Sequence, residues 1–110
     1  MLSCVIRPEK LDAVTAALDK QHVVGMTLTD VRGFGRQKGH VEHYRGGAYT
    51  IRFISKIKVD VVIQDEDVPK AIAAIEKAAR TGRVGDGKIF VLDVPSAVRI
   101  RTGEKGTSAL

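Results

Sequence analysis

The chain has 110 residues, a formal net charge of +5, 44% hydrophobic residues and 28% charged residues. These values are typical of one globular domain with its own core; they exclude a disordered chain, and no apolar run approaches the roughly 20 residues that span a bilayer. The positive charge favours anionic partners, whereas an aromatic content of 5%, with no Trp, disfavours a surface that stacks nucleic-acid bases.

The first residues predict a short β-strand. A β-prone run around Val5 and Arg7 ends at Pro8, which suits the first turn of a helix because its missing N–H is not needed there. The N-terminus has neither the basic leader nor the apolar segment of a signal peptide, so we expect a cytoplasmic protein. The single cysteine, Cys4, lies in this apolar run and is expected to be a small buried residue and not a nucleophile.

An amphipathic helix and a second strand follow. Apolar residues recur at helical spacing and stop before Gly25: Leu11, Val14 and Leu18. From Met26 to Val31 the period changes to two, which is typical of a half-buried strand.

The longest alternation in the chain predicts the third strand. Between Ile51 and Ile63, apolar residues occupy one parity, and charged residues such as Lys56 and Lys58 occupy the other. One face of this strand should therefore meet helices, and the other should be more polar.

A second helix and a fourth strand complete the pattern. Acidic residues 65–67 favour a helix start, because negative charge is stabilised at a helix N-terminus. Gly82 ends this helix, Ile89 to Val94 predicts the last strand, and residues 102–110 are expected to form a flexible polar tail. The buried stripe of the helix is expected to be Val68, Ile72, Ile75 and Ala79.

This order of elements predicts one α+β domain over residues 1–110. It is the ferredoxin-like βαββαβ arrangement, a four-stranded antiparallel sheet with two helices on one face. We expect self-association to cover part of the other face. The apolar residues expected on that open face are Cys4, Ile6, Ile54 and Val62.

The connection between the second and third strands, about residues 35–53, is much longer than a hairpin needs. It is rich in glycine and charge and therefore gains little by burial. A long loop of this composition indicates a functional segment.

Three basic segments could bind an anion. Residues 33–39 combine glycines with cations, and residues 81–88 hold three glycines whose N–H groups could form a nest for an anion, next to Lys88. Arg99 and Arg101 would point the same way in an extended segment. Each segment alone could equally be a solvated loop, so the indication comes from their combination. Residues 81–88 are not a Walker loop, because its Ser or Thr is missing and a strand follows.

Together, these segments resemble the PII nitrogen-regulatory signal proteins. The resemblance rests on residues 33–39, on 44–46 with Tyr49, on 81–91 and on 99–104, and it extends over nearly the whole chain. It implies a homotrimer with three nucleotide sites in the clefts between subunits, each binding ATP or ADP competitively.

The resemblance also implies specific ligand residues. Nucleotide would be lined by Thr27, Gly35, Arg36, Val62, Gly85, Asp86, Gly87, Lys88, Arg99 and Arg101. The effector 2-oxoglutarate would be held by Gln37, Lys38, Gly39 and Lys56, beside a Mg²⁺ ion that is bridged to ATP and bound by Gln37. A triphosphate and a dicarboxylate both need cations and N–H donors, and Mg²⁺ accepts a single protein ligand when phosphate and water supply the rest.

The long loop would be the effector loop of this family, the T-loop. By the resemblance, it would dock to an ammonium transporter, which could recruit the protein to the membrane, or to enzymes and gene regulators of nitrogen metabolism. Tyr49 matches the tyrosine that a nucleotidyltransferase uridylylates or adenylylates in some members. Arg52 stands where many relatives have an acidic residue, and Gly47 replaces a serine that some members phosphorylate, which excludes that modification.

Two other functions remain as alternatives. A small enzyme on this fold, such as an acylphosphatase or a slow nucleotide hydrolase, would need a general base, and none is evident. An RNA-binding module with the same topology would need exposed aromatic residues on the central strands, which the sequence lacks. His22, His40 and His43 do not have the spacing of a metal cluster. We therefore expect a regulatory protein that is not an enzyme and does not bind nucleic acid.

Overall fold

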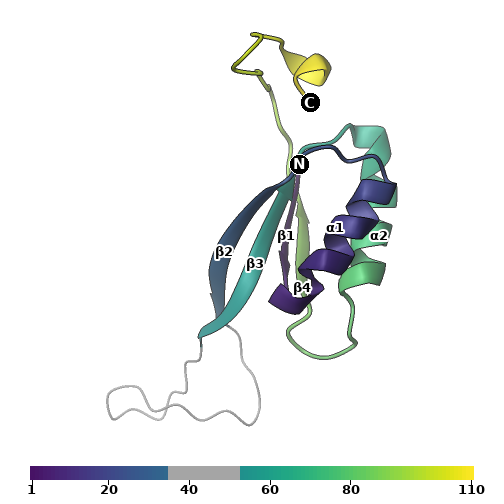
Figure 1. Cartoon of the computed structure of the whole chain (residues 1–110), viewed down its shortest axis with the longest axis vertical. Coiled ribbons are helices and arrows are strands. Elements are labelled where there is room, and N and C mark those ends of the chain that lie inside the picture. Colours follow the sequence, from purple (N-terminus) through teal and green to yellow (C-terminus); the bar gives the residue numbers. More distant parts are fainter. Residues whose placement is uncertain (35–52) are drawn as a thin grey trace.

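A computed structural model describes residues 1–34 and 53–110. Its main elements are β1 (Leu2–Ile6), α1 (Leu11–Lys20), β2 (Thr27–Phe34), β3 (Phe53–Val61), α2 (Val68–Ala79) and β4 (Gly87–Val91). The four strands form one antiparallel sheet in the order β2-β3-β1-β4. Figure 1 shows both helices on one side of this sheet. The predicted ferredoxin-like α+β fold is confirmed.

No helix in the described part of the chain is long and apolar enough to cross a membrane.

The core lies between the central strands and the two helices. It consists of fully or almost fully buried side chains from β1, α1, β3 and α2, namely Leu2, Cys4, Ile6, Val14, Leu18, Val59, Val61, Ala71, Ile75 and Ala79. Helical spacing predicted Val14, Leu18, Ile75 and Ala79 correctly, and Leu11, Val68 and Ile72 pack against this core while partly exposed.

Cys4 and Ile6 do not lie on the open face of the sheet, so that prediction was wrong. Cys4 lies opposite Val59 and Ile6 opposite Ile57, and residues directly opposite in an antiparallel pair share a face. Both therefore face the helices. The prediction that Cys4 is a buried hydrophobe is confirmed, because its side chain is fully buried. Burial, with a contribution from the charge of Asp60, also raises the pKa of its thiol to about 11.

The second strand is longer and more exposed than its alternation indicated. β2 runs three residues beyond the predicted end at Val31, and most of its side chains are exposed instead of half-buried. The reason is its position, because β2 is an edge strand that lies away from the helices (Figure 1). The last strand also differs, since it begins at Gly87 and ends at Val91, before the predicted end at Val94.

The C-terminal segment has local structure. Val98 and Lys105 form a β-bridge, and the N–H of Gly103 donates to the carbonyl of Arg99 at 2.8 Å. A 3-10 turn spans Gly106–Ala109. The flexibility expected of residues 102–110 stays a prediction.

Gly87 allows β4 to start against β1. Its φ is +102°, and a Cβ at this position would lie 1.7 Å from the carbonyl oxygen of Val5. No L side chain fits at this separation, so only glycine permits the pairing of Val5 with Lys88 without a backbone shift.

We expect Gly87→Ala to lower the free energy of unfolding by more than Gly82→Ala does, as measured by urea denaturation. Gly82 is a matched control because its φ is +85°, yet a Cβ at that position would have no described atom within 4 Å. The free energy of unfolding of the control should therefore fall only by the cost of placing alanine in the left-handed backbone conformation, about 1–2 kcal/mol. Equal losses for the two variants would contradict the steric explanation.

Candidate functional site

The glycine-rich loop Thr81–Gly87 joins α2 to β4 at the end of the sheet where the long segment after β2 begins. Figure 1 shows this loop at the same end of the sheet as the end of β2 and the start of β3. Phe34 and Phe53 form the last pair between β2 and β3, with their ring centroids 6.3 Å apart. An open groove of about 580 Å³ lies between these parts and is lined by Gly33, Phe34, Ile54 and Lys56 on one side and by residues 83–88 on the other.

Glycine is required at three positions of the loop. Gly82, Gly85 and Gly87 have φ values of +85°, +102° and +102°, in the left-handed region that other residues avoid. These glycines turn the chain tightly between α2 and β4.

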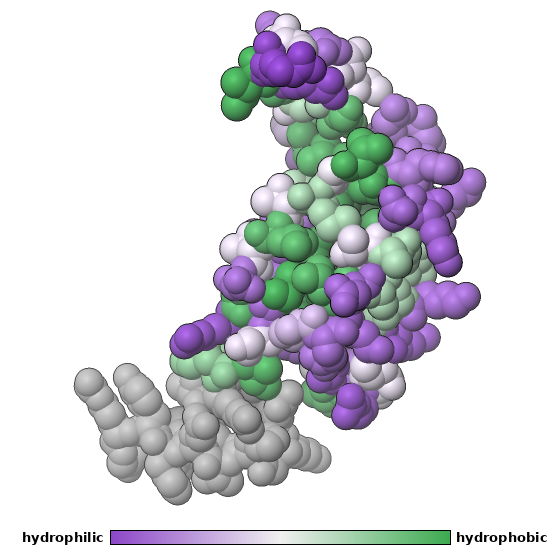
Figure 2. Space-filling view, viewed as in Figure 1, coloured by the Kyte–Doolittle hydropathy of each residue, from purple (hydrophilic) through white to green (hydrophobic). Residues whose placement is uncertain are grey.

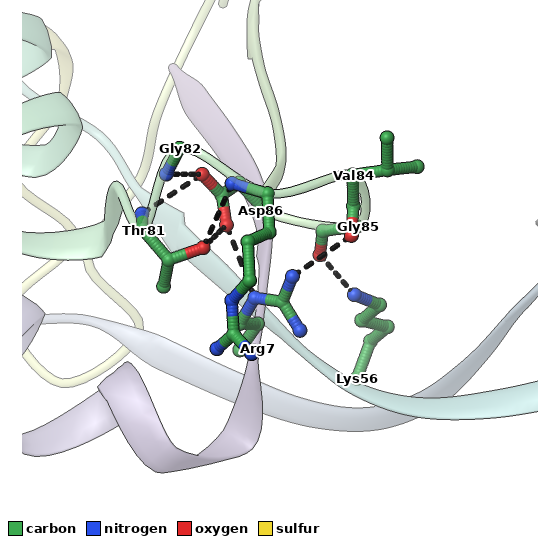
Figure 3. Close-up of polar contacts among 8 residues, drawn as sticks. Arg7, Lys56, Thr81, Gly82, Val84, Gly85 and Asp86 are labelled. Carbon is green, nitrogen blue, oxygen red and sulfur yellow. Dashed lines mark hydrogen bonds and ion pairs between the residues drawn. The ribbon is translucent and has the colours of Figure 1, made fainter.

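The carboxylate of Asp86 points back into this loop (Figure 3). Its Oδ2 accepts the N–H groups of Thr81 and Gly82 at 2.8 and 2.9 Å, and its Oδ1 accepts the Thr81 hydroxyl and Arg7 Nε, the latter at 3.1 Å. The hydrogen bond from the Thr81 hydroxyl, with those from the backbone and Arg7, holds the pKa of Asp86 well below its usual range, although burial opposes this. Asp86 is therefore ionised in the folded protein at neutral pH.

Two cations reach the loop from the sheet. The Nη2 of Arg7 donates to the carbonyl of Val84 at 2.9 Å, and the Nζ of Lys56 donates to the carbonyl of Gly85 (Figure 3). Burial, followed by the nearby charge of Arg7, lowers the pKa of Lys56. The groove therefore contains positive charge that is only partly compensated, and a carboxylate or phosphate group fits such a site.

The loop already holds one anion of its own. We expected successive N–H groups in residues 81–88 to be offered to a ligand, but those of Thr81 and Gly82 are bound to Asp86. These two groups therefore bind an anion of the chain itself, because a carboxylate four or five residues along the chain reaches them.

The structure brings together only some of the predicted ligand residues within one chain. Lys56 and residues 85–88 lie at the groove. Thr27 begins β2 and Val62 follows β3, at the other end of the sheet. Since Lys56 and Val62 are six residues apart along one extended segment, they are separated by about 20 Å.

The two arginines lie beyond that second end, in the C-terminal segment (Figure 1). Arg99 Nη2 donates to the carbonyl of Leu110 at 3.1 Å, and its Nη1 is 3.6 Å from a carboxylate oxygen of Glu104. Arg101 is exposed. Thr27 and Val62 line another groove with Leu110, so this end forms a second group of predicted ligand residues.

The remaining predicted site residues lie outside the described part of the chain. They are Gly35, Arg36, Gln37, Lys38, Gly39 and Tyr49. Within residues 1–34 and 53–110, no three His, Cys, Asp or Glu side chains are grouped to hold a metal ion.

Sequence reasoning did not identify Arg7 or Asp60 as parts of either end, and it included Thr81 only as the first residue of the glycine-rich segment 81–88. Arg7 is 79 residues from Asp86, and only the pairing of Ile6 with Gly87 makes them neighbours. Asp60 lies opposite Thr27, and among the described residues its buried Oδ1 has no hydrogen-bond partner. No signal in the sequence separates these residues from other polar positions.

The network around Asp86 predicts a specific pH dependence. Because the pKa of Asp86 is lower in the folded state, the ionised carboxylate stabilises the fold at pH values above the pKa of about 4 that this group has in the unfolded chain. This stabilisation is lost as the pH falls through the lower pKa of the folded state. Urea denaturation should therefore show Asp86→Asn to be less stable than the parent by a constant amount between about pH 5 and 8. The difference should shrink below about pH 4.

Asp19→Asn is the control for this measurement. Asp19 is an exposed carboxylate at the end of α1, and Asp19→Asn should not show the loss of stability at neutral pH that Asp86→Asn shows. A difference between Asp86→Asn and the parent that grows on acidification would contradict the assignment.

Comparisons with known proteins identify the family. The family described as nitrogen regulatory protein P-II matches residues 1–104. Proteins named nitrogen regulatory protein P-II from Azospirillum brasilense and Microchaete diplosiphon are each 53% identical over 109 residues, and one from Synechocystis is 51% identical. Each alignment covers 99% of this chain and 97% of the relative, whose name describes a regulator and not an enzyme. The chain belongs to the nitrogen regulatory protein P-II family.

Proposed function

We propose that this nitrogen-regulatory signal protein senses ATP or ADP together with 2-oxoglutarate, and that it acts on partner proteins through its T-loop. The observation that carries the proposal is the groove that the glycine-rich loop shares with the ends of β2 and β3. A ligand in this groove would touch the stem of the T-loop directly. Ligand occupancy would thus bias the conformation of the loop, as in other switches that order or release a segment.

The chemistry of the groove suits phosphate and carboxylate ligands. Lys88 lines the groove beside Gly85 and Gly87 and would meet a polyphosphate. Lys56 now donates to a neutral carbonyl, and the carboxylate of 2-oxoglutarate would offer it a charged and therefore stronger acceptor. A Mg²⁺ ion there would take most of its ligands from phosphate, 2-oxoglutarate and water, with Gln37 as its protein ligand, which this ion accepts.

The separation of the predicted ligand residues supports a site built by two copies of the chain. One subunit would supply the glycine-rich loop, Lys56 and Lys88, and its neighbour would supply Thr27, Val62 and the two arginines. A head-to-tail contact of this kind closes into a ring, and we propose a homotrimer. Exposed apolar side chains along the sheet, including Phe90, are available for such a contact, and Figure 2 shows hydrophobic residues gathered beside the polar helices and continuing into the C-terminal segment.

Signalling would end in protein contacts. The T-loop would dock to an ammonium transporter, which would bring this protein to the membrane, or to enzymes and regulators of nitrogen metabolism. Nucleotidylation of Tyr49 by a nucleotidyltransferase would add charge and bulk and so change docking.

Calorimetric titration tests the coupled site. We expect saturable binding of ATP, competition by ADP, and binding of 2-oxoglutarate in Mg²⁺ only after ATP is present. Lys56→Met should abolish 2-oxoglutarate binding and lower the affinity for ATP by a smaller factor. Lys77→Met, on the exposed face of α2, should change neither affinity. Equal 2-oxoglutarate binding with and without ATP would refute the coupling.

Mixed oligomers test the shared cleft. Lys88→Ala and Arg101→Ala should each abolish most ATP binding when present in every subunit. After denaturation and refolding of an equal mixture, about a quarter of the clefts should combine two intact halves and bind ATP again. If each site were built within one chain, every subunit in the mixture would stay defective, and no binding would return.

A further inference from the structure

We propose that Asp86 is the internal anion that shapes the glycine-rich loop, that Arg7 holds it there, and that both are positioning residues, so that the Asp86 carboxylate does not contact the nucleotide. This inference rests on the proposed function only in so far as the loop binds ATP. It reassigns the carboxylate of Asp86 from an expected ligand contact to the support of the loop, while residue 86 still lies along the groove.

The hydrogen bonds of Asp86 leave no room for a ligand. A carboxylate has about four acceptor positions. Asp86 uses two on Oδ2, for the N–H groups of Thr81 and Gly82, and two on Oδ1, for the Thr81 hydroxyl and Arg7. All positions are occupied within the protein, so a further donor from a ligand or metal would have to displace one of these bonds.

Arg7 anchors both sides of the turn to the sheet. It follows β1, and its Nε binds Asp86 while its Nη2 binds the carbonyl of Val84. A guanidinium can grip two acceptors with fixed geometry, whereas a lysine ammonium acts as a single point charge. Arg7 therefore fixes the carboxylate and the preceding turn relative to β1, and with them the placement of Gly85 and Gly87.

The charge of Asp86 makes the two possible roles distinguishable. A carboxylate that merely lined the groove would repel a triphosphate, so its replacement by Asn would tighten ATP binding. A carboxylate that shapes the loop has the opposite effect, because Asn has one acceptor oxygen and would lose the donors on its other side. The direction of the change in affinity therefore decides between the roles.

The test compares Asp86→Asn, Arg7→Lys and the charge-matched control Asp19→Asn in two measurements. The first is amide hydrogen exchange of Thr81 and Gly82 without nucleotide, and the second is the dissociation constant for ATP. We expect faster exchange in Asp86→Asn and Arg7→Lys, with ATP binding weakened about tenfold or more in Asp86→Asn. The control should match the parent in exchange and bind ATP equally or slightly more tightly.

Two outcomes would overturn the proposal. Unchanged exchange of Thr81 and Gly82 in Asp86→Asn would remove its role in shaping the loop, and ATP binding as tight as in the parent, or tighter, would remove its role in positioning the site. If the parent bound no ATP, the proposed function would fail, and the exchange measurement would still decide the role of Asp86. If Asp86→Asn did not fold, Arg7→Lys would decide, because it keeps the charge and loses the two-armed grip: unchanged exchange of Thr81 and Gly82 in that variant would overturn the proposal.

Discussion

The pairing of β1 with both β3 and β4 is the constraint on which the rest of the structure depends. Ile6 lies opposite Ile57 on one side and Gly87 on the other. This register fixes the core, because it turns the apolar parities of three strands towards the helices. It also sets the end of β1 beside the glycine-rich loop, so that Arg7 reaches Asp86 and Lys56 reaches Gly85.

Periodicity in the sequence predicted the order and type of every main element, because each helix and the long third strand carries a clear apolar repeat. It did not predict faces or edges equally well. Cys4 was assigned to the wrong face because β1 is short and Ser3 is its only polar residue, which is a weak signal of its orientation, and the exposure of β2 depends on its place at the edge of the sheet. Both are set by pairing between strands that are distant in sequence.

The candidate site was likewise predictable from the sequence only in its local features. Glycines and cations within one segment were visible in the sequence, and positive φ values at Gly82, Gly85 and Gly87 account for those glycines. Arg7 was not visible, because its partner is 79 residues away and nothing local distinguishes it from a solvated arginine. The engagement of Asp86 with Thr81 was also hidden, since the same residues could have turned outwards to a ligand.

The proposed division of the site between two subunits would account for predicted ligand residues at opposite ends of one sheet. Neither end alone offers both the cations of the groove and the arginines of the C-terminal segment, so affinity would depend on assembly. The subunit that contributes the groove also carries the stem of the T-loop between Phe34 and Phe53. A ligand would therefore act on the loop of that subunit first, and the neighbour would sense it through Thr27, Val62 and the two arginines. Binding energy can shift the loop only by the difference between the contacts that the ligand makes in its two conformations, and the groove at the stem is where such a difference arises.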